Sequence, residues 1–195
     1  SIEEYPAPTL VAPEDASTIY NTYPTFKWEE VDNTIDYILE YSQDDTFTSS
    51  ETRSCPTTSC LPNDDLTLGT WYWHVKSTNT HHESDWSSTW SFTVASLPTP
   101  TLIDPARGAT FGNIDVTYTW DKVTGADRYI LEIKKVSDNS VVHKAYYDAA
   151  ARCDTTACSV TVPGGLELEA HKWHVRALAG ATYSDWSLWN AFHVT

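Results

Sequence analysis

Trp73-His74-Val75-Lys76, followed by Ser84-Asp85-Trp86-Ser87, is the stretch that decides the fold of this 195-residue chain. It occurs a second time, 100 residues later, as Trp173-His174-Val175-Arg176 and Ser184-Asp185-Trp186-Ser187. Self-similarity at a long, nearly fixed spacing is the signature of a repeated structural unit. The chain is therefore predicted to contain two copies of one domain.

Further landmarks repeat at a slightly smaller spacing. Trp28 and Tyr37-Ile38-Leu39-Glu40 return 92 residues later as Trp120 and Tyr129-Ile130-Leu131-Glu132. The extra residues of the second copy fall between periodic segments, where loops accept insertions. The seam at residues 95–100 holds two prolines, which favour a short and semi-stiff connector. We therefore expect one domain over residues 1–96 and a second over residues 97–195.

Within each copy the side chains alternate between two faces at a period of two, which is typical of strands. Trp71, Trp73 and Val75 alternate with Tyr72, His74 and Lys76. Successive side chains of a strand point to opposite faces, so we expect Trp73 and Val75 inside and His74 and Lys76 outside. Only residues 145–152 suggest a helical turn. Short strands between frequent turns predict an all-β antiparallel sandwich in each half.

The same residues carry a family resemblance. Trp120-x-x-Val123-x-Gly125-Ala126-x-x-Tyr129 resembles the B–C region of a fibronectin type III domain. Ser84-x-Trp86-Ser87, with Phe92 and Val94 after it, resembles that family's F–G loop and G strand. The resemblance covers nearly all of both copies and is closest to the Trp-rich versions of bacterial and archaeal surface or secreted proteins. It implies two tandem immunoglobulin-like sandwiches, usually without catalytic activity.

Four cysteines form two Cys-x4-Cys pairs, Cys55/Cys60 and Cys153/Cys158, which are not part of the common pattern of that family. Four cysteines permit three pairings, and one local disulfide in each repeat fits best because each domain then carries its own cross-link. Such bridges indicate an oxidising compartment, so we expect an extracellular or cell-surface location. The alternative is a zinc site that combines the thiolates with His81 and His82.

The chain is strongly acidic, with a net charge of −15. Residues 1–97 hold 16 Asp/Glu and 3 Lys/Arg, a net charge of −13, whereas residues 98–195 hold 11 and 9, a net charge of −2. Such a surface repels phosphate, so neither nucleic acid nor an anionic membrane is an expected partner. No apolar run reaches the roughly 18 residues of a membrane span. Ca²⁺ is the one cofactor left open, although no loop has calcium-loop spacing and no metal site is expected.

The candidate site residues begin with a stack of aromatic and cationic side chains on the outer face of each domain. We expect Trp86 to fold over Lys76, and Trp186 over Arg176, because a ring gains free energy by lying on a cation. Trp186-Ser187-x-Trp189 is similar to the Trp-Ser-x-Trp-Ser box of cytokine receptor modules, in which Trp and Arg side chains interleave. The expected role is structural, and an aromatic sugar-binding platform is the alternative.

Several other side chains are candidates for ligand contact. His81 and His82 lie in the predicted F–G loop of the first copy, and the exposed aromatic candidates are Tyr72, Tyr183 and Trp189. Adjacent residues of an extended chain face apart, so the histidine pair alone does not indicate a metal. A polar loop is the simpler interpretation.

The sequence contains no nucleophile elbow, phosphate loop or metalloprotease motif, so an enzyme is not expected. We expect a spacer, structural or adhesion module whose first partners are other domains of a larger cell-surface or secreted protein. The absence of Met fits a piece of such a protein. The alternative is a carbohydrate- or protein-binding module that contacts a polysaccharide or another surface protein through exposed aromatics. A third hypothesis is self-assembly of the acidic domain onto a more basic surface.

Overall fold

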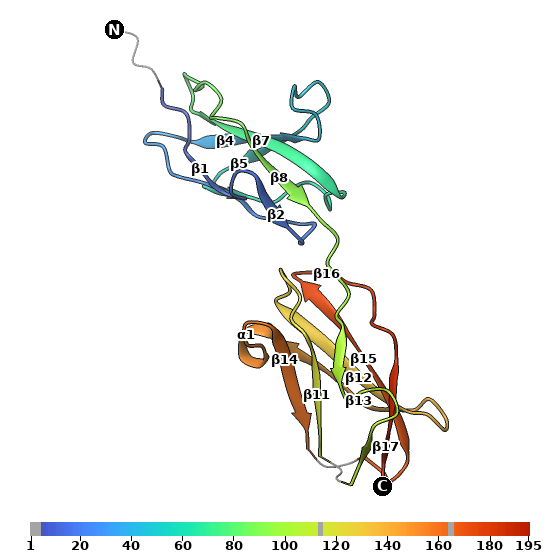
Figure 1. The fold of residues 1–195 in the computed structure, drawn as a ribbon. Coiled ribbons are helices and arrows are strands. Elements are labelled where there is room, and N and C mark those ends of the chain that lie inside the picture. Colours follow the sequence, from blue (N-terminus) through green and yellow to red (C-terminus); the bar gives the residue numbers. More distant parts are fainter. Residues whose placement is uncertain (1–4, 113–114, 164–165) are drawn as a thin grey trace. The chain divides into compact units, whose positions relative to one another are not determined.

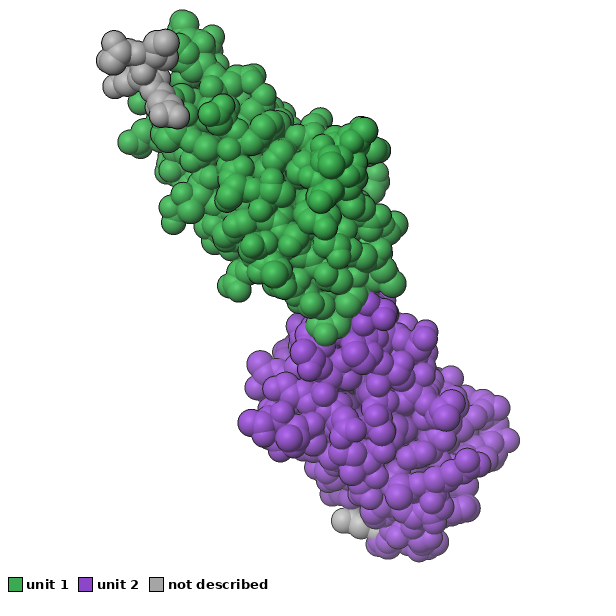
Figure 2. All heavy atoms as spheres, turned by 45° about the horizontal axis from the view of Figure 1, so that its top comes forward, with its two compact units in different colours: residues 1–95 green, residues 96–195 purple. Residues whose placement is uncertain are grey.

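The computed structural model describes residues 5–112, 115–163 and 166–195 of the chain. The chain divides into two compact units, Ser1–Ala95 (unit 1) and Ser96–Thr195 (unit 2), shown in Figures 1 and 2. Each unit contains two β-sheets and its own buried apolar side chains. The all-β prediction is therefore confirmed.

Unit 1 pairs a three-stranded sheet with a five-stranded one. The first sheet has the order β1 (Leu10–Ala12), β3 (Phe26–Trp28) and β6 (Ser59–Cys60). The second has the order β2 (Ser17–Ile19), β8 (Trp90–Val94), β7 (Gly69–Thr78), β4 (Asp36–Ser42) and β5 (Glu51–Cys55). Its central strands are β7 and β4, which carry the repeated Trp-His-Val and Tyr-Ile-Leu-Glu motifs.

Alternation along the central strands of unit 1 determines its core. Trp73 and Val75 of β7 and Leu39 of β4 are completely buried. Phe26 of β3 packs from the other sheet, with its ring centroid 5.1 Å from that of Trp73 and 5.8 Å from that of Phe92. Burial of such side chains from both sheets is the main favourable contribution to folding of the unit.

Unit 2 repeats this arrangement with longer strands. Its smaller sheet has the order β14 (Ala157–Val162), β11 (Val116–Asp121) and β9 (Leu102–Asp104). The larger sheet has the order β10 (Thr110–Phe111), β17 (Asn190–Val194), β15 (Ala170–Ala179), β12 (Arg128–Lys135) and β13 (Val141–Asp148), and β16 (Thr182–Tyr183) pairs with β15. The short helix α1 (Ala149–Arg152) lies inside the segment 145–152 for which a helical turn was the expectation. Trp173 and Val175 are completely buried.

Candidate functional site

Four serines hold the Ser-Asp-Trp-Ser loops against the central strands β7 and β15. In unit 1 the backbone amide of Ser87 donates to the carbonyl of Val75 at 2.9 Å, and the Ser87 Oγ accepts from the Val75 amide at 3.0 Å. Ser84 makes the same pair of bonds with Ser77, at 2.9 and 3.0 Å. Each serine thus satisfies both backbone groups of one strand residue, as a neighbouring strand would.

Unit 2 contains the same serine clamps. Ser187 is bonded to Val175 at 2.9 and 3.0 Å, and Ser184 to Ala177 at 3.0 and 2.9 Å. In both units the serine hydroxyls also donate to a neighbouring loop carbonyl, for example from Ser187 to Leu188 at 3.2 Å. Both partners of every clamp are buried, so the loop path is fixed. That path carries Trp86 and Trp186 over the outer face of their sheets.

The aromatic ladder of unit 1 consists of Phe47, His74, Trp86 and Lys76. The His74 ring lies between Phe47 and Trp86, with centroid distances of 4.1 Å on both sides and nearly parallel planes. The Lys76 Nζ lies 5.1 Å from the Trp86 ring centroid and 2.5 Å from a carboxylate oxygen of Glu83. The unit 1 ladder therefore consists of three stacked rings followed by a cation, and that cation is paired with a surface carboxylate.

The aromatic ladder of unit 2 is longer and consists of Trp189, His174, Trp186, Arg176 and Tyr183. The His174 ring lies 3.5 Å from Trp189 and 3.9 Å from Trp186. The Arg176 guanidinium lies between two rings, 4.7 Å from Trp186 and 4.1 Å from Tyr183. Three further cations lie over its Trp rings, namely Lys134, Lys144 and Lys172.

The structure places Trp86 beside Lys76 and Trp186 beside Arg176, the pairs named from the sequence. His74 and His174 belong to the outer face but are not exposed, because rings on both sides cover them. An aromatic sugar platform needs a free ring face, and in unit 2 both faces of Trp186 are in contact with His174 and Arg176. The ladder itself is therefore a poor platform.

A carboxylate lies beneath each ladder histidine. The Nε2 of His74 lies 2.8 Å from Glu40, and that of His174 lies 2.9 Å from Glu132. Burial lowers the pKa of His174, so its neutral ring donates a proton from Nε2, since a carboxylate only accepts. Lys134 and Lys144 also contact Glu132, at 3.1 and 2.9 Å.

Two opposing effects act on these glutamates. Burial acts to raise the pKa of Glu132, but hydrogen bonds from Lys144, Lys134 and His174 outweigh it and lower that pKa to about 2. Burial likewise acts to raise the pKa of Glu40, and hydrogen bonds from His74 and Ser50 hold it below its usual value. Both carboxylates are therefore charged at neutral pH and act as fixed acceptors.

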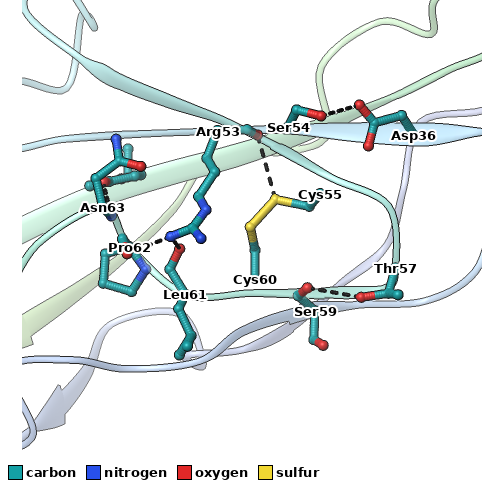
Figure 3. The surroundings of a disulfide bond; sticks show 11 residues. Asp36, Arg53, Ser54, Cys55, Thr57, Ser59, Cys60, Leu61, Pro62 and Asn63 are labelled. Carbon is teal, nitrogen blue, oxygen red and sulfur yellow. Dashed lines mark hydrogen bonds between the residues drawn. A yellow bond between two sulfur atoms is a disulfide. The ribbon is translucent and has the colours of Figure 1, made fainter.

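The structure contains the two predicted local disulfides. Cys55–Cys60 connects β5 to β6 and so joins the two sheets of unit 1, as Figure 3 shows. Cys153–Cys158 connects the residue after α1 to β14 in unit 2. Because all four cysteines are paired, no thiolate is left for zinc, and the alternative zinc site with His81 and His82 is wrong. Within the described ranges no group of three His, Cys, Asp or Glu side chains is placed to hold a metal ion.

Arg53 supports the segment after the first disulfide. Its guanidinium donates to the carbonyls of Leu61 and Pro62, at 2.9 and 2.7 Å. Because this cation is bonded to backbone carbonyls, it fixes the chain that leaves β6 (Figure 3). The hollow beside the disulfide has no aromatic side chain in its lining, which consists of Thr25, Arg53, Ser54, Cys55, Pro56, Ser59, Cys60 and Leu61.

The remaining predicted contact residues do not meet at one place. His81 and His82 are exposed, and both of their backbone amides bind the side chain of Asn79 at 2.9 Å. Their rings are 6.4 Å apart and tilted, so they form a loop surface and no chelating pair. Tyr72 is half-buried on β7, whereas Tyr183 and Trp189 are members of the unit 2 ladder.

Sequence reasoning missed Phe47 and a groove beside Trp71. Phe47 comes from the β4–β5 loop, where its backbone has a positive φ of 54°, and no periodic pattern indicates its contact with His74. The groove is lined by Tyr41, Ser42, Gln43, Asp44, Ser49, Ser50, Glu51 and Trp71. The groove could have been found in the sequence only by placing Trp71 beside Asp44 and Glu51. That step requires the register of the strands, which the sequence alone does not provide.

No protein-family model matches the chain, and no curated protein matches it. Among solved structures the chain is similar to the FN1-FN3 domains of chicken CNTN1, with 13% identity and a TM-score of 0.53, over 98% of this chain and 68% of that one. Two further similar structures have lower scores. A two-domain fibronectin type III segment of chicken tenascin has 13% identity and a TM-score of 0.37, over 96% of this chain and 99% of that one. The chicken interferon gamma receptor alpha chain has 14% identity and a TM-score of 0.40, over 97% and 98%.

At these identities the likeness concerns the fold alone. The fold prediction of tandem fibronectin type III-like sandwiches is confirmed. Function has to be argued from the residues of this chain. No helix in the described part of the chain is both long and apolar enough to cross a membrane.

Proposed function

We propose that the chain is a non-catalytic tandem module that serves as a spacer, structural or adhesion part of a larger cell-surface or secreted protein. Fibronectin type III-like domains in tandem are typically structural or binding modules, which supports the coarse assignment. The Trp-rich composition, with nine Trp, favours a kinship with the prokaryotic surface proteins named above. Two disulfides favour an oxidising, extracellular location.

One observation carries the proposal: the serine clamps and the His–Trp–cation part of the ladder recur in both units at similar distances, although the net charges of the units differ by 11. A ligand site would be expected to follow the charge and loops of its own domain. A feature that is indifferent to both is better explained as a requirement of the sandwich itself. The aromatic ladder therefore stabilises each domain and does not serve as a ligand site, which is consistent with a spacer or structural role for the module.

The titratable groups support a non-catalytic role. Each ladder histidine has a carboxylate partner, Glu40 or Glu132, and each carboxylate is held by hydrogen bonds that lower its pKa. Trp rings cover both histidines, so a substrate could not approach either pair. A general acid or base needs access to its substrate, and the covering rings deny it to both pairs.

The test of the spacer role is the hydrodynamic behaviour of the whole chain. NMR relaxation of backbone amides should give one common tumbling time for both units, because the six-residue seam contains two prolines. Sedimentation should give a monomer across the concentrations used. Independent tumbling of the units, or a compact dimer, would contradict a rigid spacer.

A second function, a protein- or carbohydrate-binding module, is favoured by one feature that the ladder does not explain. This feature is the groove of unit 1 between the β4–β5 loop and the start of β7. Its residues differ from those of unit 2, as expected for a site that belongs to a single domain.

A further inference from the structure

The groove beside Trp71 has the size of a small-ligand site. Its volume is about 430 Å³, which is within the usual range of roughly 300–1,000 Å³ for such sites. Its lining residues come from the end of β4, the following loop, the start of β5 and the start of β7. They include two carboxylates, Asp44 and Glu51, and no Lys or Arg.

The aromatic wall of the groove is held in place before any ligand arrives. Trp71 is half-buried, and its indole N–H donates to the carbonyl of Thr67 at 2.9 Å. Behind it lies Tyr41, with ring centroids 5.9 Å apart, and the Tyr41 hydroxyl accepts from the Asn63 amide at 2.8 Å. A ring fixed in this way loses little conformational freedom when a ligand lies on it.

Both carboxylates of the groove accept hydrogen bonds. Asp44 accepts from the backbone amide and hydroxyl of Thr46, at 3.0 and 2.8 Å, and from the Thr48 amide at 3.1 Å. These hydrogen bonds hold the pKa of Asp44 below its usual value. Glu51 is exposed and accepts from the Asn63 side chain at 3.1 Å. The groove therefore presents an aromatic face beside two negative charges in a unit of net charge −13.

The equivalent corner of unit 2 differs in its residues from the corner of unit 1 that contains the groove. The position equivalent to Gln43 is Lys135, and that equivalent to Trp71 is His171. The Lys135 Nζ lies between two carboxylates, 2.8 Å from Glu167 and 3.1 Å from Glu169, and these contacts raise its pKa to about 12. Unit 2 therefore pairs its own cation with its own carboxylates at positions equivalent to Thr67 and Gly69, whereas the neutral Gln43 of unit 1 donates from Nε2 to the Leu68 carbonyl at 3.2 Å. In unit 1 no lining residue supplies a cation.

We propose that the unit 1 groove binds a cationic side chain, an arginine or lysine presented by a partner protein. A guanidinium or ammonium is attracted to the face of Trp71 by the ring quadrupole and to Asp44 and Glu51 by charge. The acidic surface of unit 1 adds attraction at longer range. This site goes beyond the spacer role, since a spacer needs no ligand, and it stands or falls independently of it.

The test is an NMR titration of the ¹⁵N-labelled full chain with acetyl-Gly-Arg-Gly-amide in 20 mM NaCl. The Trp71 indole signal and the backbone amides of Gln43 and Asp44 should shift and saturate together. Raising NaCl to 300 mM should weaken binding several-fold, because exposed charges are then screened. Maltohexaose serves as the neutral comparison probe.

Variants separate this groove from the general acidity of unit 1. Asp44→Asn with Glu51→Gln should weaken binding about fivefold, as expected for two partly exposed ion pairs. Glu29→Gln with Glu30→Gln removes the same charge from the segment after β3 and should change affinity less than about twofold. If the double variant does not fold, Glu51→Gln alone replaces it in the test, because the glutamine oxygen can still accept the hydrogen bond from Asn63.

Three results would overturn the proposal. The peptide shifts could spread over the acidic surface without saturating, or the two double variants could lose affinity equally. Maltohexaose could also shift the groove signals while the peptide does not, which would assign the site to a neutral sugar. Any of these leaves the tumbling and sedimentation test of the spacer role unaffected.

Discussion

Replacing Ser87 by alanine tests whether the serine clamps stabilise the sandwich. The Ser87 Oγ accepts from the Val75 amide at 3.0 Å, and both residues are buried. Alanine leaves that N–H without a partner and without access to water, at a cost of about 1–3 kcal/mol. The backbone bond from Ser87 to the Val75 carbonyl remains, so a loss of about 2 kcal/mol is expected for unit 1. For a domain of this size that lowers the unfolding midpoint by roughly 8–16 °C.

Differential scanning calorimetry of the oxidised chain can resolve this loss, because each unit has its own core. Ser88→Ala is the matched control, since the neighbouring Ser88 is exposed and its hydroxyl has no partner in the clamp. Ser187→Ala in unit 2 identifies the other transition. Amide exchange at Val75 should also become faster in Ser87→Ala. If Ser87→Ala unfolds within about 3 °C of Ser88→Ala, a loss below the cost of one unsatisfied N–H, the clamps are not stabilising.

Three further predictions concern the ladder, its carboxylate and the cross-links. Arg176→Ala should cost unit 2 about 1–2 kcal/mol and Lys76→Ala should cost unit 1 less, because Arg176 lies over two rings and Lys76 over one; equal losses in urea titrations would contradict this. The folded pKa of Glu132 is depressed, so its contribution of about 3 kcal/mol is present above pH 4.5 and lost as the pH falls toward 2. Glu132→Gln should therefore be less stable at pH 7 and show a flatter acid limb, and an unchanged limb would refute the assignment. Cys55→Ala with Cys60→Ala should remove about 2 kcal/mol from unit 1 alone, and a calorimetric shift of both transitions would contradict local bridges.

The core and the outer cations could be read from the sequence because both follow from strand alternation. Trp73 and Val75 are buried, and Lys76 lies over Trp86, as a period of two requires. The burial of His74 could not be read in this way. Alternation gives the face on which a side chain lies, but not whether a loop folds back to cover that face. Trp86 covers one face of His74, and Phe47 covers the other from a loop with no repeated counterpart.

The position of the second Trp explains why the two ladders differ: the segments from Ser87 to Phe92 and from Ser187 to Phe192 are equally long, but Trp90 aligns with Asn190 and Thr89 with Trp189. Trp90 pairs with Trp73 across β8 and β7 and packs against it edge-on at 6.1 Å, whereas Asn190 is opposite Trp173. Trp189 therefore precedes the strand and lies on the outer face over its histidine. In unit 1 the second Trp is directed to the core, and Phe47 covers the free face of His74 instead. The motif spacing indicated the change for Trp90, but no local pattern pointed to Phe47.

Comparison of the two units separates what the fold requires from what it leaves free. The clamps need a serine hydroxyl at one distance from a strand amide, and a change of net charge from −13 to −2 does not alter that geometry. The carboxylate under each histidine obeys the same constraint, because the ring must be held flat between its neighbours. The corner at Gln43 and Lys135 obeys no such constraint, since Lys135 is paired with Glu167 and Glu169 whereas Gln43 donates to the Leu68 carbonyl and lines a groove. A partner that distinguishes the two domains has to contact positions such as this corner, which the fold leaves free to differ between the two units.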